Sequence, residues 1–295
     1  MPVLPLYAGS GSRKDAMLKH TFCHIPRIGA TTEQRYWDKG LKHWDIAASS
    51  IGEAALGGKT AWVRQHLDES HERLETGDAH WFDSRLPSGE SWRLFGEFRD
   101  RVAYVDIETT GLTYGEDHIT TIALSGAGEV KTYVYGDNLD EFQDDIRAFD
   151  VISTYNGKCF DVPFIERSFG IRLDMGHIDL RYVLKKIGFS GGLKSIEKQM
   201  GIGRDDLEGV DGYFAVILWH EYQNTGNPAA LETLLAYNAA DVISLESLMV
   251  HAYNTLLDET PFADGNRQEE RPALTVSHEP DRKLVDKLMV RHGLF

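Results

Sequence analysis

The sequence predicts an α/β protein in which a mixed β-sheet is flanked by helices. Three segments of strand character, separated only by Gly-rich turns, follow one another at 102–108, 118–126 and 129–136. After them, helical and extended patterns alternate, with a helical period in 139–149 and a strand in 150–157. Three consecutive strands followed by strand–helix alternation are typical of a mixed sheet with helices on both faces.

The rest of the chain is expected to be mainly helical, because its apolar residues recur at helical spacing. Before the strands, the sequence predicts one or two helices and then a loop (51–87) and a short amphipathic stretch (88–100). After them it predicts a helix ended by glycine (162–170), a segment that begins extended and turns helical (177–188), and a mainly helical region (193–257) whose strongest pattern is 228–257. The chain then continues with an extended polar linker (258–281) and a last amphipathic helix (282–295).

Composition and charge limit the classes of function. The chain has 295 residues and a formal net charge of −15, which argues against a surface coated in basic charge for non-specific nucleic-acid binding. Residues 1–45 run against this trend, with seven basic and four acidic side chains. A solvated surface remains the alternative to a binding patch there. No apolar run is long enough for a transmembrane helix, and the start lacks a secretory signal, so no membrane partner is expected. Two cysteines, Cys23 and Cys159, fit a reducing cytoplasm.

Two carboxylates end the first predicted strand, in the stretch "RVAYVDIETTGLTYG" at 101–115. Residues two apart on a strand point to the same face, so Asp106 and Glu108 project together. Neighbouring carboxylates repel each other and resist desolvation, and a bound cation reverses that penalty. The alternative is that Asp106 or Thr109 caps a turn.

Further acidic residues follow later strands and helices. Asp161 stands just before a predicted helix, where it could be an N-cap as well as a ligand. Tyr237 and Asp241 are four apart on a predicted helix and share a face beside an apolar stripe. The alternative for this pair is a half-buried tyrosine and an aspartate at the edge of the stripe. If the four carboxylates converge, they form an all-oxygen cluster suited to Mg²⁺ or Mn²⁺. Two such ions about 3.5–4 Å apart can activate a water and stabilise the leaving oxygen of a phosphodiester.

These motifs resemble those of the DEDD exonuclease superfamily (DnaQ-like) on the ribonuclease H-like fold. "DIETTG" is similar to its first motif, "YNGKCFDVPF" to its second and "YNAAD" to its third, and the resemblance covers roughly residues 85–257. Tyr-x-x-x-Asp marks the tyrosine branch (DEDDy), whereas the histidine branch would place a histidine at position 236, which is alanine. The lead-in "WRLFGEFRDRVAYVDIETTGL" resembles a family of stand-alone predicted exonucleases of this fold.

The resemblance implies roles for particular residues. Asp106, Glu108, Asp161 and Asp241 would be metal ligands for two ions, and Tyr237 would position the attacking water. Thr109, Asn156 and Phe160 would lie near the substrate. Tyr155 and Phe164 are further aromatic candidates for stacking on bases, with core packing favoured for Phe164. Asp179 is an additional acidic candidate near the site, with a structural role favoured. Lys194 is a candidate for a phosphate contact, with a solvated lysine as the alternative.

The amino-terminal segment "FCHIPRIGATTEQRYWDKGLKHWDIAAS" at 22–49 resembles a helix-hairpin-helix element, in which backbone amides hold a DNA phosphate without reading bases. Arg27 stands where the first glycine of that motif usually occurs, and could contact phosphate directly. The alternative is a small helical subdomain packed on the catalytic core.

These expectations define three domains: a helical N-terminal region (1–98), a ribonuclease H-like exonuclease domain (99–258), and a linker with a C-terminal helix (259–295). The leading hypothesis is a metal-dependent 3′–5′ exonuclease that acts on single-stranded or frayed nucleic-acid ends, with DNA favoured over RNA. A structure-specific endonuclease on the same fold and a nucleic-acid-binding module with a vestigial site are the alternatives. The sequence identifies no protein partner.

Overall fold

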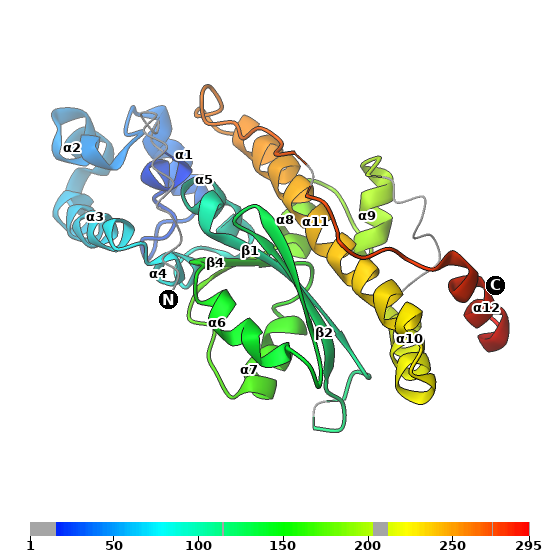
Figure 1. Ribbon diagram of the computed structural model, residues 1–295. Helices are drawn as coiled ribbons and strands as arrows, with labels where there is room; N and C mark the ends of the chain where they lie inside the picture. The colour runs from blue at the N-terminus through cyan, green and yellow to red at the C-terminus, as the bar shows by residue number, and fades with distance from the viewer. Residues whose placement is uncertain (1–15, 114, 203–211, 273, 295) are drawn as a thin grey trace.

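A five-stranded mixed sheet forms the centre of the computed structural model, which describes residues 16–113, 115–202, 212–272 and 274–294 (Figure 1). The strand order is β3-β2-β1-β4-β5, with β1, β2 and β3 antiparallel and β1, β4 and β5 parallel. The mixed α/β sheet predicted from the sequence is therefore confirmed. The strands are β1 Val102–Thr109, β2 Ile119–Gly126, β3 Glu129–Val134, β4 Val151–Thr154 and β5 Gly176–Asp179.

Helices cover both faces of this sheet, and β1 sends alternate side chains to each (Figure 1). Ala103, Val105 and Ile107 share one apolar cluster with residues of α6 (Phe142–Ile146) and α7 (Asp161–Phe169). Tyr104 belongs instead to the cluster that contains residues of the long helix α11 (Pro228–Asp258). The residue two positions after Tyr104 is Asp106, so β1 directs the carboxylate towards the α11 side.

The helix predicted at 228–257 is α11, which has 31 residues and crosses the sheet. The Asn227 side chain accepts a hydrogen bond from the Ala229 N–H, and Pro228 occupies the first turn, where its missing N–H costs nothing. Other helices of this half are α8 (Leu180–Lys186), α9 (Leu193–Gln199) and α10 (Gly212–Thr225), and η6 (Leu139–Glu141) precedes α6.

The described residues before β1 contain helices and turns but no strand. Their apolar side chains join those of α8 and α11 in one continuous core cluster, so this region packs on the sheet-containing part of the chain. A further helix, α4, occupies part of the segment where a loop was expected after the helices of 51–87. The elements are η1 Met17–His20, α1 Ala30–Asp38, η2 Trp44–Ala48, α2 Ser50–Leu56, η3 Gly57–Lys59, α3 Thr60–Glu75, α4 Ala79–Asp83, η4 Ser88–Leu94, α5 Phe95–Phe98 and η5 Arg99–Arg101.

A network of charged side chains, buried apart from Lys186, links this N-terminal region to α8. Arg93 lies between two glutamates, with its Nη1 2.8 Å from Glu33 Oε2 and its Nε 2.7 Å from Glu90 Oε2. Glu90 also pairs with Lys186 of α8. The other oxygen of Glu33 accepts the backbone N–H groups of Phe22 and Cys23, which fixes the turn before α1.

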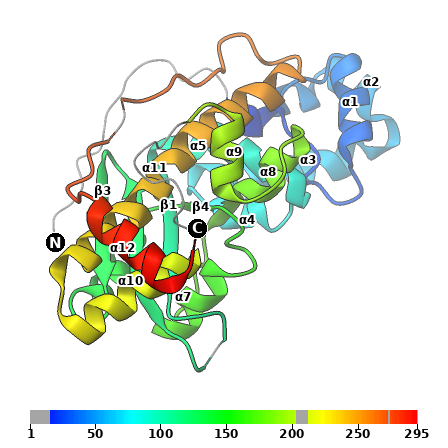
Figure 2. The ribbon, with the colours of Figure 1, turned by 90° about the vertical axis from the view of Figure 1, so that its right-hand side faces the viewer.

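The C-terminal helix α12 (Arg282–His292) packs on the same chain (Figure 2). Its Leu284, Val285 and Leu288 share an apolar cluster with residues of α10 and α11. The described residues between α11 and α12 form turns and irregular backbone. Among the described residues, no helix has both the length and the apolar character needed to span a membrane.

Candidate metal centre

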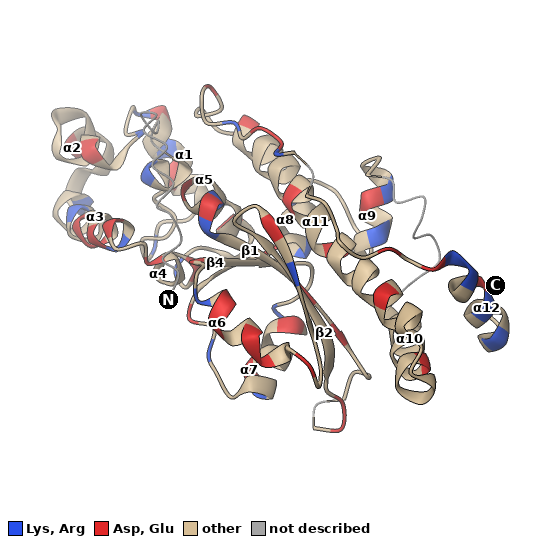
Figure 3. Cartoon of the chain, viewed as in Figure 1, with Lys and Arg blue, Asp and Glu red and all other residues tan. Residues whose placement is uncertain are grey.

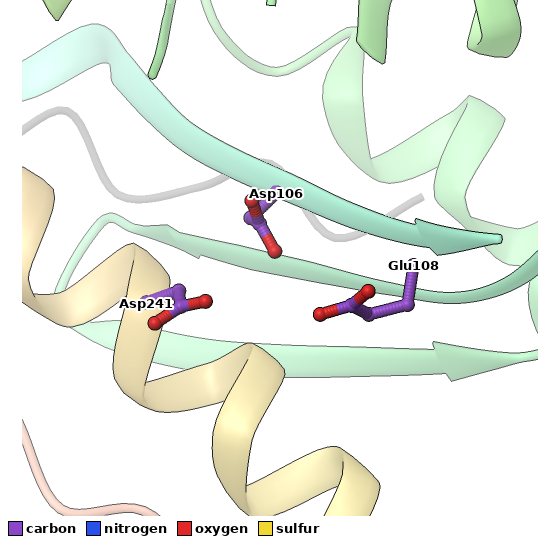
Figure 4. Close-up of side chains that lie close together, drawn as sticks. All are labelled: Asp106, Glu108 and Asp241. Atoms are coloured by element: carbon purple, nitrogen blue, oxygen red, sulfur yellow. The ribbon is translucent and has the colours of Figure 1, made fainter. Parts of the chain in front are cut away.

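Three carboxylates from two elements meet on the α11 side of the sheet. Asp106 and Glu108 come from β1 and Asp241 from α11, and one oxygen of each lies within 4.8 Å of the others (Figure 4). Asp241 is buried, whereas Asp106 and Glu108 are half-buried. A set of carboxylate oxygens at this spacing fits a hard divalent cation such as Mg²⁺ or Mn²⁺.

The local structure of β1 explains why its two carboxylates reach this point. Asp106 pairs with Ala123 and Glu108 with Thr121 of β2, so both are held by an antiparallel ladder. The register shifts between Glu108 and Thr109, directly after the second carboxylate. Thr109 Oγ1 donates to the Gly111 carbonyl at 2.6 Å, which ends the strand in a turn. The turn-capping alternative therefore describes Thr109, while Asp106 lies within the strand.

Asn238 of α11 is a site residue that the sequence reasoning missed. Its side-chain amide donates to the Asp106 carboxylate at 2.7 Å and to the Asp106 carbonyl at 3.2 Å. Its Oδ1 in turn accepts a hydrogen bond from Thr121 Oγ1 at 3.1 Å. Asn238 is completely buried and stands three positions before Asp241, so helical spacing places both on one face. That spacing within "YNAAD" is the signal that could have identified it.

The negative potential at the centre favours the binding of either protons or metal ions. The pKa of Asp106 lies well above its usual range because burial disfavours its charge and because Asp241, Glu108 and Asp161 add negative potential. The hydrogen bond from Asn238 opposes this rise only in part. Bound cations would supply the missing positive charge and hold the carboxylates ionised.

Asp161 lies beside this cluster but outside the group of three. It is the first residue of α7 and is buried, and the backbone N–H groups of Asp161 itself and of Ile107 in β1 favour its charged form. Burial raises the pKa of Asp161 to about 7. Phe160, and not Asp161, occupies the N-cap position of α7. The N-cap alternative therefore does not describe Asp161, whose negative charge helps to raise the pKa of Asp106.

Tyr237 lies one helical turn before Asp241 on α11. Its ring is buried, and burial raises the pKa of Tyr237 to about 12, so its hydroxyl stays protonated at neutral pH. Lys194 of α9 places its Nζ 5.6 Å from the centre of the ring. The positive charge of Arg282, at the start of α12, also acts on this tyrosine. Tyr237 is therefore close both to the Asp241 carboxylate and to two cationic side chains.

The turn after β4 positions the second motif. Asn156 has a positive φ of 68°, which ends the strand earlier than the predicted 150–157. Asp179 holds this turn by accepting the backbone N–H groups of Asn156 at 2.8 Å, Lys158 at 3.1 Å and Arg181 at 3.1 Å. The Asn156 side chain accepts a hydrogen bond from Arg181. Asp179 thus makes the structural contacts expected of it.

The aromatic candidates of this motif differ in burial. Phe164 is 2% exposed and belongs to the core between the sheet, α6 and α7. Phe160 is half-buried against the same core, with its ring 5.2 Å from that of Phe164. The Tyr155 hydroxyl donates to the Gly191 carbonyl. Phe160 is therefore the more accessible of the two phenylalanine rings.

Arg27 belongs to the N-terminal helical region, in the turn that leads into α1. The residue is exposed and has a positive φ of 65°, a backbone conformation that glycine adopts readily. The segment 22–49 forms this turn followed by α1 and η2. Among the described residues before the turn, which start at 16, the helix is the short η1.

Comparison with known proteins places the fold in a family. The RNase_H_2 family model, described as RNase_H superfamily, matches residues 103–253, and the chain belongs to that superfamily. The uncharacterized protein YprB of Bacillus subtilis (strain 168) is 30% identical over 215 residues, which cover 65% of this chain and 51% of the relative. The chain thus spans about half the length of this curated relative.

Two solved structures are similar over a little more than half of the chain. The family B DNA polymerase of the archaeon Pyrobaculum calidifontis has 18% identity and a TM-score of 0.42, over 57% of this chain and 27% of the polymerase. Brucella melitensis NrnC bound to pGG has 19% identity and a TM-score of 0.40, over 58% of this chain and 79% of NrnC.

Proposed function

We propose that this protein is a metal-dependent 3′–5′ exonuclease of the tyrosine branch (DEDDy), acting on single-stranded or frayed nucleic-acid ends. The observation that carries the proposal is the meeting of Asp106, Glu108 and Asp241 within 4.8 Å on the sheet of a chain that belongs to the RNase_H superfamily. A cluster of buried acids is costly without compensating charge, and divalent cations supply it.

The proposed metal ligands are Asp106, Glu108, Asp241 and Asp161, for two Mg²⁺ or Mn²⁺ ions. When bound, such ions supply Lewis-acid activation of a water and stabilisation of the leaving oxygen. The chain's own part is to hold the ligands. Asn238 fixes the Asp106 carboxylate, and the Ile107 N–H favours the charged form of Asp161.

Tyr237 is proposed to donate its hydroxyl hydrogen bond to the attacking water. Its raised pKa of about 12 supports this role, because a protonated phenol can donate at any physiological pH. Lys194 lies beside the ring and is proposed to attract a phosphate of the substrate. Phe160, Asn156 and Thr109 are proposed to line the path of the terminal nucleotides.

The remaining proposals concern substrate and organisation. DNA is favoured over RNA because the segment 22–49 resembles a helix-hairpin-helix element, with Arg27 exposed in its turn. The division into residues 1–98, 99–258 and 259–295 is proposed as the domain organisation. A cytoplasmic location is proposed from the two free cysteines, of which Cys159 is exposed.

A time course on 3′- and 5′-labelled oligonucleotides tests the function. With Mg²⁺ or Mn²⁺, the 5′-labelled strand should shorten through a ladder, and the 3′ label should appear at once as a mononucleotide. Matched DNA and RNA strands compare the sugars, and a circular single strand should stay intact. Cleavage of the circle would indicate an endonuclease, and inert wild-type protein on every end would refute the proposal.

A further inference from the structure

The C-terminal helix α12 concentrates positive charge in an acidic protein. Its eleven residues include the basic side chains Arg282, Lys283, Lys287 and Arg291, and a single acidic one, Asp286. The chain as a whole has a formal net charge of −15. Figure 3 shows blue segments along this helix, whereas red segments are scattered over the rest of the ribbon. A polyanion would therefore meet locally favourable potential at α12.

Specific contacts fix α12 on α10 and α11. The Asp281 N–H donates to Thr233 Oγ1 of α11 at 2.9 Å, and the Asp281 side chain caps the helix by accepting the Leu284 N–H. At the other end, Arg291 pairs with Glu221 of α10 at 2.6 Å. The apolar face of α12 is buried in the same cluster as Tyr237. The basic side chains therefore lie on a helix that is already docked on the protein. Because the backbone of α12 is ordered before a ligand binds, binding costs little conformational entropy there.

The first turn of α12 lies next to the candidate site. Thr233, which holds the start of α12, stands one helical turn before Tyr237 on α11. Arg282 is close enough to act on the charge of the Tyr237 hydroxyl, and Lys194 approaches the same ring from α9. The basic helix therefore begins at the residue proposed to orient the attacking water.

Two lysines extend this positive region away from the site. Lys283 and Lys287 are four apart, so they share a face of α12, and both are exposed. Neither makes an ion pair with another residue in the described parts of the chain. Exposed lysine ammonium groups are compact charges suited to phosphates and carry no sequence preference.

We propose that α12 is the phosphate track of this protein: Lys283 and Lys287 hold the backbone of the single strand whose terminal nucleotide lies at the carboxylate cluster. The inference rests on the proposed nuclease function and assigns to it a binding surface outside residues 103–253, the part that matches the family model. The track explains how an acidic protein retains an acidic polymer.

The test compares full-length wild-type protein with the double variant Lys283→Gln/Lys287→Gln. The matched control is Arg147→Gln/Arg172→Gln, which removes the same charge from exposed side chains just after α6 and just after α7, on the other face of the sheet. Fluorescence anisotropy with labelled oligothymidylate in EDTA measures binding without hydrolysis, over a range of NaCl. Thermal unfolding checks that each variant is folded.

The track variant should bind the oligonucleotide roughly tenfold more weakly than wild type, and its log–log salt slope should be shallower by about 1.4, since each lost contact on a single strand removes about 0.7. The control should match wild type. In Mg²⁺, KM for a long strand should rise about tenfold at unchanged kcat, while hydrolysis of a dinucleotide, which lacks the upstream backbone proposed to lie on Lys283 and Lys287, should not change.

Each result decides a separate point. If the track variant binds like the control while wild type degrades the strand, the track is refuted and the exonuclease proposal stands. If wild type cleaves nothing and the track variant binds the oligonucleotide more weakly than wild type, the nuclease proposal fails and α12 remains a nucleic-acid-binding surface. Equal binding by all three proteins, without cleavage, refutes both.

Discussion

Two regions of this protein bury charged side chains, and they do so in opposite ways. In the N-terminal region, Arg93 lies between Glu33 and Glu90, and Lys186 completes a set of two acids and two bases. On the sheet, Asp106, Glu108 and Asp241 meet as three acids, and the hydrogen-bond donor to the Asp106 side chain is the neutral amide of Asn238. The first set balances its own charge, and the second concentrates charge of one sign.

The pKa values of the two regions shift accordingly. Burial alone would raise the pKa of Glu90, but Arg93 and Lys186 outweigh it and hold that pKa below its usual range. Burial also raises the pKa of Asp106, and its neighbours Asp241, Glu108 and Asp161 raise it further. A buried carboxylate with cationic partners stays ionised and fastens elements together, whereas one among other carboxylates needs protons or metal ions. This difference separates a structural charge cluster from a functional one.

The largest effect on activity is expected when the carboxylate cluster of Asp106, Glu108 and Asp241 loses a metal ligand. Asp106→Asn keeps the size of the side chain but removes its charge, so hydrolysis should fall by about a thousandfold or more, equivalent to about 4 kcal/mol of activation free energy. The free energy of unfolding measured in EDTA should not fall, because a mutually repelling charge is gone. Activity assays and urea unfolding check both halves. Retained activity would remove Asp106 from the mechanism.

Removing Arg93 from its cluster with Glu33 and Glu90 should instead lower the stability of the fold. Arg93→Met leaves Glu33 and Glu90 buried without their shared cation, so the free energy of unfolding should fall by about 3–5 kcal/mol. Arg147→Met, which breaks an exposed ion pair with Asp144, is the control and should cost less than about 1 kcal/mol. Urea unfolding measures both. Equal costs for the two variants would show that the buried network does not fasten the N-terminal region.

Divalent ions should stabilise the folded protein by binding to the carboxylate cluster of Asp106, Glu108 and Asp241. At a concentration one hundred times the dissociation constant, Mg²⁺ or Mn²⁺ should raise the free energy of unfolding by about 2.7 kcal/mol. Asp241→Asn should lose most of this gain, and Arg93→Met should keep it, because its destabilised fold retains the ligands. Unfolding curves with and without metal measure the gain. An equal gain in Asp241→Asn would locate the ions elsewhere.

The smallest expected effect is a pH dependence in the N-terminal region. His24 lies among Trp44, Trp81 and Phe82, and burial lowers its pKa from 6.5 to about 3. Between these values the unfolded chain binds one proton more than the folded chain. Stability is therefore lost as the pH falls, at up to about 1.4 kcal/mol per unit.

Unfolding of His24→Gln measures this contribution. Between pH 7 and pH 5, wild type should lose about 2 kcal/mol more stability than the variant, which can retain a hydrogen bond to Ser70. His220→Gln, at an exposed ring of α10, is the control and should follow wild type. If wild type and His24→Gln lose the same free energy of unfolding between pH 7 and pH 5, His24 does not remain neutral when buried.

Much of the candidate site follows from local periodicity. The period of two along β1 predicted that Asp106 and Glu108 share a face, and the period of the helix predicted the same for Tyr237 and Asp241. The succession of strands predicted the mixed sheet that the structure has. Each of these predictions needs only residues that are close in the sequence.

Other features depend on contacts between distant parts of the chain. Asn238 contacts Asp106 across 132 positions, Arg93 contacts Thr21 across 72, and α12 reaches Tyr237 only because the preceding segment returns along α11. Asp161 lies in the first turn of α7, with Phe160 at the N-cap, and its charge acts on Asp106 of β1, which helix-start propensity could not show.

The sequence by itself determined the elements and the faces on which their acidic residues lie, because side-chain direction repeats with the backbone. The tertiary structure decided which faces meet, and so whether each buried charge finds an opposite charge or one of its own sign. Charge balance depends on distance in space, which the order of residues does not contain.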